Sequence, residues 1–339
     1  MRRGLPVPDL DHVLEHVGDA WQSLAGARLF ITGGTGFVGQ WLLESLLWAS
    51  GRRNLSVSAT VLTRDPDRFR AESPHLAGHR DVALLRGNVH DFDFPKGEFP
   101  FVIHAAVEHA FDRDVEGTRR VLEFARTHAT RRLLFTSSGA VYGVQPPDLA
   151  SIPEDYAVPL AIDPRSDVPD YAQAKRASEL LCATEARQHG FAALIARMFA
   201  FVGPHLPLDR NFAAGNFIRD ALAGGPIRIQ GDGTPYRSYL YAADLTVWLW
   251  TILLRGEPSR PYNVGSGEAV TIAELARIVA NVAGAAIPIE IAGTPVAGAP
   301  PARYVPSVAR ARQELGLQPV ISLEDGVRRT YTWARENCR

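Results

Sequence analysis

A glycine-rich turn near the N-terminus constrains the fold of this 339-residue chain more than any other feature. The turn reads Gly33-Gly34-Thr35-Gly36-Phe37-Val38-Gly39, and it follows the β-type run RLFIT at 28–32. An apolar helical pattern begins directly after it and continues to residue 48. Glycines allow a tight turn and the close approach of another backbone segment. A strand, a turn of this kind and a helix, in that order, predict the first βαβ unit of a parallel sheet.

Further strand and helix patterns alternate as far as residue 196. Strands are expected at 57–62, 82–85, 101–104, 132–136 and 192–196, and helices at 9–24, 114–128, 170–189 and 244–254. This alternation predicts an α/β protein with a Rossmann-like, doubly wound parallel sheet. The glycine turn and the helix after it then form a site for a dinucleotide, because the free N–H groups of a helix N-terminus attract a pyrophosphate.

The composition changes near residue 198, where proline and glycine begin to interrupt shorter elements. We therefore expect three parts. They are an N-terminal helical extension at 1–27, a dinucleotide-binding domain at 28–197 with 238–263, and a smaller C-terminal substrate-binding subdomain at 198–237 with 264–339.

Charge and composition exclude several classes of protein. The chain has 36 basic and 37 acidic residues, so it lacks the basic excess that typical nucleic-acid-binding proteins carry. Its longest largely apolar run, at 247–254 with only Thr251 polar, is too short to span a membrane, and its first residues lack the apolar core of a signal peptide. Two cysteines cannot build a metal cluster or a disulfide framework. We expect a cytoplasmic protein with no metal and no nucleic-acid or membrane partner.

The end of the second strand bears on the choice of dinucleotide. An acid there binds the ribose 2′-hydroxyl of NAD, whereas an arginine accommodates the 2′-phosphate of NADP. This strand ends in Thr63-Arg64-Asp65. Arg64 and the Thr63 hydroxyl favour NADP, and the alternative is that Arg64 is solvated while Asp65 binds the ribose of NAD.

A second pattern indicates proton-transfer chemistry. Tyr171 and Lys175 are four residues apart at the start of a predicted helix, on one helical face. An adjacent ammonium lowers the pKa of a phenol and makes it a usable base. Lysine is scarce, since Lys96 and Lys175 are the only two in the chain, and arginine does not replace a compact ammonium. Ser138, at the end of the strand at 132–136, is placed to hold the reacting oxygen.

These features resemble one family. The resemblance extends over further stretches of the chain, which are LFITGGTGFVGQWLL, VIHAA, LLFTSSGAVYG, YAQAKRASE, RMFAFVGP and GDGTPYRSYLYAADL. The family is the extended short-chain dehydrogenase/reductase family, and specifically its NAD(P)-dependent nucleotide-sugar epimerase/dehydratase branch. The resemblance implies that Tyr171 is the catalytic base and acid, that Lys175 binds the nicotinamide ribose, and that Ser138 is the catalytic hydroxyl. It also implies a homodimer formed through the helices at 114–128 and 170–189.

The resemblance assigns two further groups of residues. The expected cofactor-binding residues are Gly33, Thr35, Gly36, Phe37, Val38, Gly39, Thr63, Arg64, Asn88, Val89, Ala105, Tyr171 and Lys175. The expected substrate-binding residues are Ser138, Asn216, Arg237 and Arg303, of which the last three would hold the nucleotide and diphosphate of a nucleoside-diphosphate sugar.

The chain also departs from the family pattern. Gly139 and Ala140 stand where the dehydratases of the family have Asp-Glu and where its decarboxylases also have a Glu at the second position. Neither residue titrates, which argues against dehydration and decarboxylation. Asn88 replaces a usual Asp, Ala200 replaces a usual Asn, and the segment after His104-Ala105-Ala106 is several residues shorter than usual.

These residues predict an NAD(P)-dependent nucleotide-sugar epimerase that inverts C4 through a transient 4-keto sugar. An NADPH-dependent 4-keto-sugar nucleotide reductase would use the same residues and is the alternative. A catalytically silent dinucleotide-binding scaffold is a minor alternative, since it predicts a broken Ser–Tyr–Lys set whereas all three residues are present.

Overall fold

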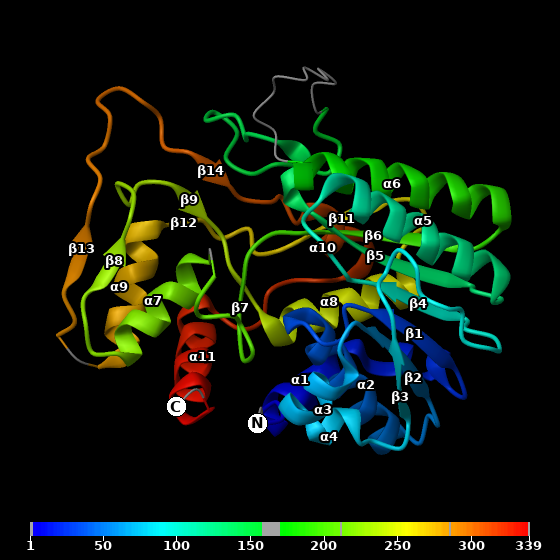
Figure 1. Ribbon diagram of the computed structural model, residues 1–339. Coiled ribbons are helices and arrows are strands. Elements are labelled where there is room, and N and C mark those ends of the chain that lie inside the picture. Colours follow the sequence, from blue (N-terminus) through cyan, green and yellow to red (C-terminus); the bar gives the residue numbers. More distant parts are fainter. Residues whose placement is uncertain (1–2, 158–169, 211, 285, 338–339) are drawn as a thin grey trace. The chain divides into compact units, whose positions relative to one another are not determined.

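The structure is a computed structural model that describes residues 3–157, 170–210, 212–284 and 286–337 (Figure 1). The chain divides into two compact units. Unit 1 comprises Met1–Gly143, Ala157–Met198 and Thr246–Tyr262, and unit 2 comprises Val144–Tyr156, Phe199–Leu245 and Asn263–Arg339. The N-terminal extension thus groups with the part of the chain that carries the glycine turn, and residues 144–156 and 238–245 group with the C-terminal part.

A seven-stranded sheet in the order β11-β6-β5-β4-β1-β2-β3 confirms the predicted Rossmann-like fold. Its strands are β1 (Arg28–Thr32), β2 (Ser58–Thr63), β3 (Val82–Arg86), β4 (Phe101–His104), β5 (Arg132–Ser138), β6 (Ala192–Met198) and β11 (Pro261–Val264). The neighbouring pairs from β3 through β1 to β6 are parallel. Since β1 lies between β2 and β4, the loops that follow these three strands emerge side by side at the carboxyl edge of the sheet.

The helices of this part of the chain are close to their predicted positions. They are α2 (Phe37–Arg53), α3 (Pro66–Glu72), α4 (Pro74–Ala77), α5 (Phe111–Thr127), the 3₁₀ turn η2 (Gly139–Tyr142), α6 (Asp170–His189) and α8 (Ala242–Arg255). The helix predicted at 9–24 is instead α1 (Val7–Val17) followed by the 3₁₀ helix η1 (Gly18–Leu24). Gly18 has a φ of 58°, which ends α1, although the apolar spacing continues past it.

The N-terminal extension is bonded to the rest of unit 1. The Trp48 indole on α2 donates a 2.8 Å hydrogen bond to the Asp11 carboxylate on α1. The ring centroids of Trp21 in η1 and Trp250 in α8 lie 5.0 Å apart, and both side chains are fully buried. The extension is therefore part of the hydrophobic core of unit 1.

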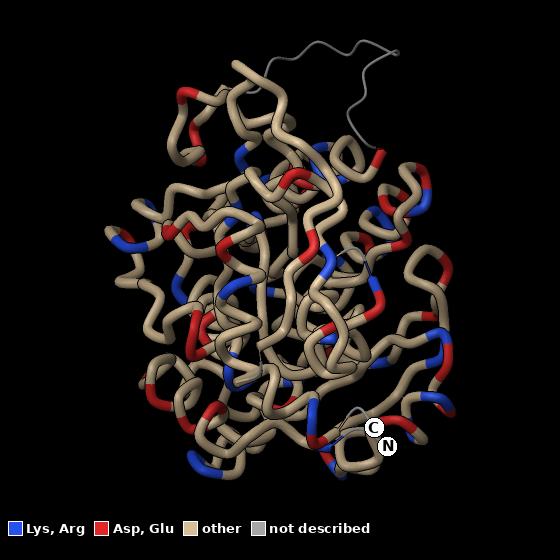
Figure 2. Tube along the Cα trace, turned by 90° about the vertical axis from the view of Figure 1, so that its left-hand side faces the viewer, with Lys and Arg blue, Asp and Glu red and all other residues tan. Residues whose placement is uncertain are grey.

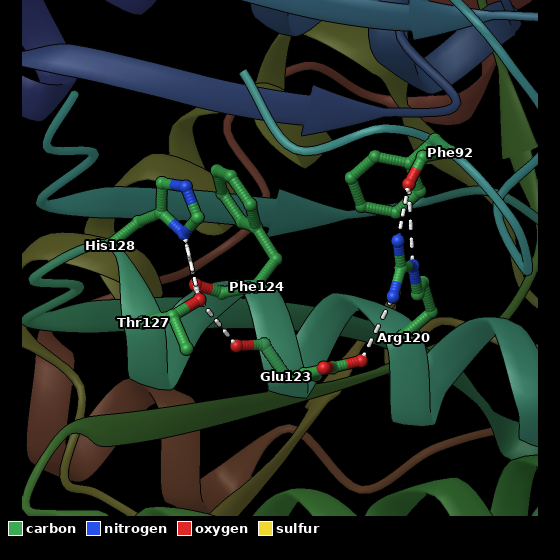
Figure 3. Close-up of polar contacts among 6 residues, drawn as sticks. All are labelled: Phe92, Arg120, Glu123, Phe124, Thr127 and His128. Atoms are coloured by element: carbon green, nitrogen blue, oxygen red, sulfur yellow. Dashed lines mark hydrogen bonds and ion pairs between the residues drawn. The ribbon is translucent and has the colours of Figure 1, made fainter. Parts of the chain in front are cut away.

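A cluster of aromatic side chains fills the space between the sheet and α5. Phe30, Phe92, Phe99 and Phe124 are almost completely buried, and the rings of Phe30 and Phe124 are 4.3 Å apart. Arg120 on α5 donates two hydrogen bonds to the Phe92 carbonyl, and Thr127 and His128 bond to the carbonyls of the preceding helical turn (Figure 3). These contacts fix α5, whose N-terminal end borders the site described below.

Unit 2 is built from short elements. They are β7 (Phe201–Val202), α7 (Ala213–Leu222), β8 (Ile227–Ile229), β9 (Tyr236–Arg237), β10 (Leu240–Tyr241), β12 (Val270–Thr271), α9 (Ile272–Ala283), β13 (Ile289–Ile291), β14 (Arg303–Tyr304), α10 (Ala309–Leu315) and α11 (Leu323–Asn337). Residues 144–156 belong here because Gln145 accepts a hydrogen bond from the Val305 backbone and Glu154 accepts one from Asn263.

Charged residues of both signs alternate along the trace (Figure 2). Within the described ranges, no helix combines the length and the apolar character that crossing a membrane requires.

Candidate active site

The glycine turn after β1 depends on the absence of side chains. Gly33 has a φ of +72°, and a Cβ atom there would lie 2.5 Å from the Ala105 backbone, which follows β4. A Cβ on Gly39 would lie 2.2 Å from the Gly33 carbonyl oxygen. Both contacts are too close for a real side chain, so these glycines let the turn pack against the β4 loop and against the first turn of α2.

The N-terminus of α2 fits a dinucleotide pyrophosphate. Its N-cap residue is Gly36, which supplies no side chain to the first N–H groups of the helix. Gly36 is exposed, and a Cβ there would meet only the Gly33 carbonyl oxygen, at 3.4 Å. Phe37 and Val38 are half-buried, and the Thr35 carbonyl is held by the Gln40 side chain at 3.0 Å. The predicted residues of the turn thus form an open cradle of backbone donors at the positive end of a 17-residue helix.

Three residues at the end of β2 have different roles. Asp65 caps α3, since its carboxylate accepts a 3.0 Å hydrogen bond from the Arg68 N–H. The Thr63 hydroxyl accepts a hydrogen bond from the Asp65 N–H. The Arg64 side chain is 68% exposed and lies 3.3 Å from the Glu108 carboxylate. Asp65 is therefore engaged in helix capping, and Arg64 is an exposed side chain paired with Glu108.

The other predicted cofactor residues lie on neighbouring loops. Asn88 follows β3 and is half-buried, and Ala105 follows β4 and donates its N–H to the Thr32 carbonyl. The Val89 side chain is 5% exposed and packs in the core, where a Cβ on Gly117 would lie 2.7 Å from it. A cofactor would therefore meet the backbone of Val89 rather than its side chain.

The structure brings Ser138, Tyr171 and Lys175 together. Ser138 ends β5, where its hydroxyl accepts a hydrogen bond from the Ala140 N–H and also bonds to the Tyr171 phenol. Lys175, one turn after Tyr171 on α6, lies with its Nζ atom 5.7 Å from the centroid of the Tyr171 ring. The same ammonium donates a 2.8 Å hydrogen bond to the Thr136 carbonyl on β5.

Burial acts on both titratable members of this set. It lowers the pKa of Lys175 to about 8, and the charges of Asp114 and Glu179 oppose that shift. Burial raises the pKa of Tyr171, whereas the hydrogen bond with Ser138 lowers it. A lysine with this pKa still carries its positive charge at neutral pH, which is the form that stabilises a phenolate.

His104 is a structural residue, as its strand-end position suggests. It is 3% exposed, and its ring nitrogens bond to the hydroxyls of Thr32 and Thr118. Burial, together with the charge of Lys175, lowers the pKa of His104 to about 3, so the imidazole is neutral. It links β1, β4 and α5 beneath the site.

Asp114 is a functional candidate that the sequence did not single out. It lies in the first turn of α5, is 8% exposed, and its Oδ1 atom accepts a 2.7 Å hydrogen bond from the Glu108 N–H. Its Oδ2 atom is buried and has no hydrogen-bond partner among the described residues. The charge of this carboxylate raises the pKa of both Tyr171 and Lys175. The sequence could have indicated this residue, because helical spacing places Asp114 on the same face of α5 as Gly117, Thr118 and Val121, all of which are buried.

His109 lies beside the same tyrosine. Its ring centroid is 5.5 Å from that of Tyr171, and its φ of 59° places a residue other than glycine in the left-handed region. The position is exposed and follows Glu108 directly, in the loop that precedes α5. A histidine there can contact a ligand that contacts Tyr171.

The turn after Ser138 carries no acid. Gly139 and Ala140 begin η2, and their side chains are a hydrogen and a methyl group. The acid of α6 that lies against β5 is Glu179, which accepts hydrogen bonds from the Ser137 hydroxyl and from the Arg197 guanidinium. This carboxylate is committed to an internal ion pair.

The predicted substrate residues lie in unit 2. Arg237 on β9 and Arg303 on β14 are on adjacent strands, and the Arg303 guanidinium lies 4.2 Å from the centroid of the Tyr236 ring. Asn216 is on α7, where its side-chain oxygen accepts a hydrogen bond from Arg219. The register pairs Arg303 with Tyr236 and Arg237 with Tyr304, so the two guanidinium groups lie on opposite faces of this strand pair, and Asn216 is on a separate element.

Two features define the class of this protein. They are the parallel sheet with a glycine turn after its first strand, and the buried Tyr–Lys pair with a serine at the end of β5. Together they are typical of a dinucleotide-dependent protein of the short-chain dehydrogenase type. More narrowly, the chain belongs to the NAD dependent epimerase/dehydratase family, whose model matches residues 29–265.

Relatives within this family catalyse different reactions. UDP-glucuronic acid decarboxylase 5 of Arabidopsis thaliana is 29% identical over 313 residues, which cover 88% of this chain and 87% of that protein. A dTDP-glucose 4,6-dehydratase of Streptomyces niveus is 27% identical over 337 residues, which cover 91% and 93%. Among solved structures, UDP-glucose 4-epimerase of Thermotoga maritima superposes with a TM-score of 0.73 at 19% identity, over 91% of this chain and 99% of that one.

Proposed function

We propose that the protein is an NAD(P)-dependent nucleotide-sugar epimerase that inverts C4 of its substrate through a transient 4-keto sugar. The observation that carries this proposal is the association of Ser138, Tyr171 and Lys175 in unit 1, where α6 meets the end of β5 in the sheet that also carries the glycine turn. The names of the relatives all contain a nucleoside-diphosphate sugar, which supports that class of substrate.

The three side chains would divide the chemistry between them. Tyr171 accepts the proton of the sugar 4-hydroxyl, and Ser138 hydrogen-bonds to the same oxygen as it becomes a carbonyl. The Lys175 ammonium stabilises the phenolate and holds the nicotinamide ribose. A bound dinucleotide supplies the acceptor and donor for the hydrogen at C4. Rotation of the keto sugar between the two transfers exposes its opposite face, and Tyr171 then returns the proton to give the epimer.

The residues after Ser138 support epimerisation over the other reactions of the relatives. Loss of water or of carbon dioxide needs a further acid or base, and Gly139 and Ala140 supply none where the resemblance places one. Glu179 is paired with Arg197 at 2.7 Å and does not replace it.

Unit 2 would hold the nucleotide and the diphosphate. Arg237 on β9 and Arg303 on β14 each offer a guanidinium group to an anionic ligand, and Asn216 offers an amide. We assign substrate binding to these three residues.

A second candidate, the NADPH-dependent 4-keto-sugar nucleotide reductase, is favoured by Arg64. This exposed guanidinium, with the Thr63 hydroxyl beside it, supports binding of a 2′-phosphate and hence of NADP. A reductase would use Ser138, Tyr171 and Lys175 in the same way, with the dinucleotide exchanged after each turnover.

The two candidates are separated by incubating the protein with a panel of nucleotide sugars and 4-keto sugars, with and without NADPH. Epimerisation of a sugar with no net change in the cofactor supports the proposal. Consumption of NADPH with a 4-keto sugar identifies a reductase instead. Absence of any turnover, together with tight dinucleotide binding, would leave the silent scaffold and overturn both.

We also propose a cytoplasmic homodimer formed through α5 and α6. Leu180 on α6 is 69% exposed, and Leu122 and Leu181 line a hollow between the two helices together with charged residues. Apolar side chains at a helix surface are typical of a subunit interface.

A further inference from the structure

An ion pair crosses the carboxyl edge of the sheet beside the glycine turn. Arg64 follows β2 and Glu108 lies in the loop after β4, and these strands flank β1 on either side. Their side chains meet at 3.3 Å. The glycine turn follows β1, and the β4 loop packs on it at Gly33. The pair therefore lies where the adenosine ribose of a dinucleotide is expected.

Glu108 is held more firmly than its partner. Its side chain is 12% exposed, against 68% for Arg64. Its backbone N–H donates a 2.7 Å hydrogen bond to the buried Asp114 carboxylate, which fixes the start of the side chain. The carboxylate is thus a preorganised acceptor, and the arginine is the more exposed member of the pair.

The other arginines around Arg64 also have acidic partners. Arg68 pairs with Glu72 at 2.6 Å, and Arg70 and Arg86 both pair with Asp67. The fourth arginine of this surface, Arg64, pairs with Glu108. A 2′-phosphate would therefore compete with Glu108 for Arg64 and would also be repelled by that carboxylate.

We propose that Glu108 determines which dinucleotide the protein accepts, by neutralising Arg64 and opposing a 2′-phosphate while accepting a hydrogen bond from a 2′-hydroxyl. The inference rests on the proposed dinucleotide binding. It makes Glu108 the counterpart, on the β4 loop, of the acid that NAD-binding proteins carry at the end of β2. The wild-type protein should then bind NAD more tightly than NADP, although Arg64 by itself favours NADP.

Calorimetric titration with ADP-ribose and with its 2′-phosphate tests this inference, because neither fragment contains nicotinamide and neither requires turnover. In Glu108→Gln, the ratio of affinities should shift toward the 2′-phosphate by about tenfold. In Arg64→Gln, the ratio should shift in the opposite direction. The matched control is Glu123→Gln, which removes the same charge from α5, where the carboxylate pairs with Arg120.

The outcomes distinguish failure of the role of Glu108 from failure of the proposed dinucleotide binding. An unchanged ratio in Glu108→Gln, or an equal gain for both fragments, overturns the role of Glu108 and leaves dinucleotide binding intact. Failure of the wild-type protein to bind either fragment overturns the dinucleotide site itself. Thermal unfolding of each variant shows whether its fold is retained.

Discussion

At the scale of single residues, burial opposes the charged forms of Tyr171 and Lys175 that the proposed chemistry requires. The proposed chemistry needs a Tyr171 phenolate and a Lys175 ammonium, and burial shifts the pKa of each group toward its neutral form. The hydrogen bond from Ser138 opposes this shift for the phenol, and the Asp114 carboxylate opposes it for the lysine. The balance keeps the pKa of Tyr171 above its ordinary value, so the lowering expected from the adjacent ammonium is not found in this structure.

Removal of the phenol should abolish most of the activity. Tyr171→Phe retains the ring but loses the oxygen that exchanges a proton with the substrate, so turnover should fall by about a thousandfold. Dinucleotide binding, measured by titration, should change little because the glycine turn is untouched. Tyr331→Phe, on α11 in unit 2, is the control and should retain full turnover. Equal losses in the two variants would contradict the role of Tyr171.

The charge of Asp114 should set the pH range of activity. Its carboxylate raises the pKa of Tyr171 and of Lys175, so Asp114→Asn lowers both. The active form has an ionised phenol and a protonated ammonium, so the pKa values of both groups together set the two limbs of a bell-shaped profile. Both limbs of the kcat/KM profile should therefore move to lower pH in the variant. The control is Asp112→Asn, two residues earlier on α5. A profile that moves to higher pH in Asp114→Asn would refute this assignment.

At the scale of secondary-structure elements, the turn between β1 and α2 is the most sensitive to substitution. A Cβ on Gly39 would lie 2.2 Å from the Gly33 carbonyl oxygen, whereas a Cβ on Gly51, in the same helix, would meet no atom within 4 Å. Gly39→Ala should cost about 1–3 kcal/mol of unfolding free energy and abolish dinucleotide binding. Gly51→Ala should be neutral or stabilise by up to about 1 kcal/mol. Urea denaturation of both variants measures the difference, and equal stabilities would contradict the predicted packing of the turn.

The elements also show what sequence patterns can and cannot specify. The strands and long helices of the sheet were predictable because buried parallel strands are nearly continuous apolar runs and the glycine turn marks the start of α2. The break between α1 and η1 was not predictable, since the apolar spacing runs through Gly18, whose left-handed φ ends the helix. Glu108 and Asp114 were missed for a different reason: their importance depends on contacts between β2, the β4 loop and α5.

At the scale of the whole molecule, the proposed dimer can be tested directly by measuring the mass of the protein in solution. Leu180 is exposed on α6, so Leu180→Glu would place a charge in an apolar interface and should convert the dimer to monomer. Gln188→Glu, near the C-terminal end of the same helix, is the control and should remain dimeric. Light scattering coupled to gel filtration gives the mass directly. A wild-type protein that is monomeric at all concentrations would exclude this interface.

The division into units was only partly accessible from sequence. The shift in composition near residue 198 coincides with the start of the second segment of unit 2 at Phe199. Residues 144–156 show no such shift, and they join unit 2 through long-range bonds from Gln145 to Val305 and from Glu154 to Asn263. Contacts that span more than a hundred residues of chain leave no local pattern to detect.

The fate of the hydrogen at C4 tests the central proposal most directly. A nucleotide sugar that is a substrate would be labelled with deuterium at C4 and incubated with the protein, and the product would be examined by NMR and mass spectrometry. Transfer through a transient 4-keto sugar predicts a 4-epimer that keeps the label at C4, with no product from Tyr171→Phe. Loss of the label to solvent, or a product that has lost water or carbon dioxide, would contradict the account.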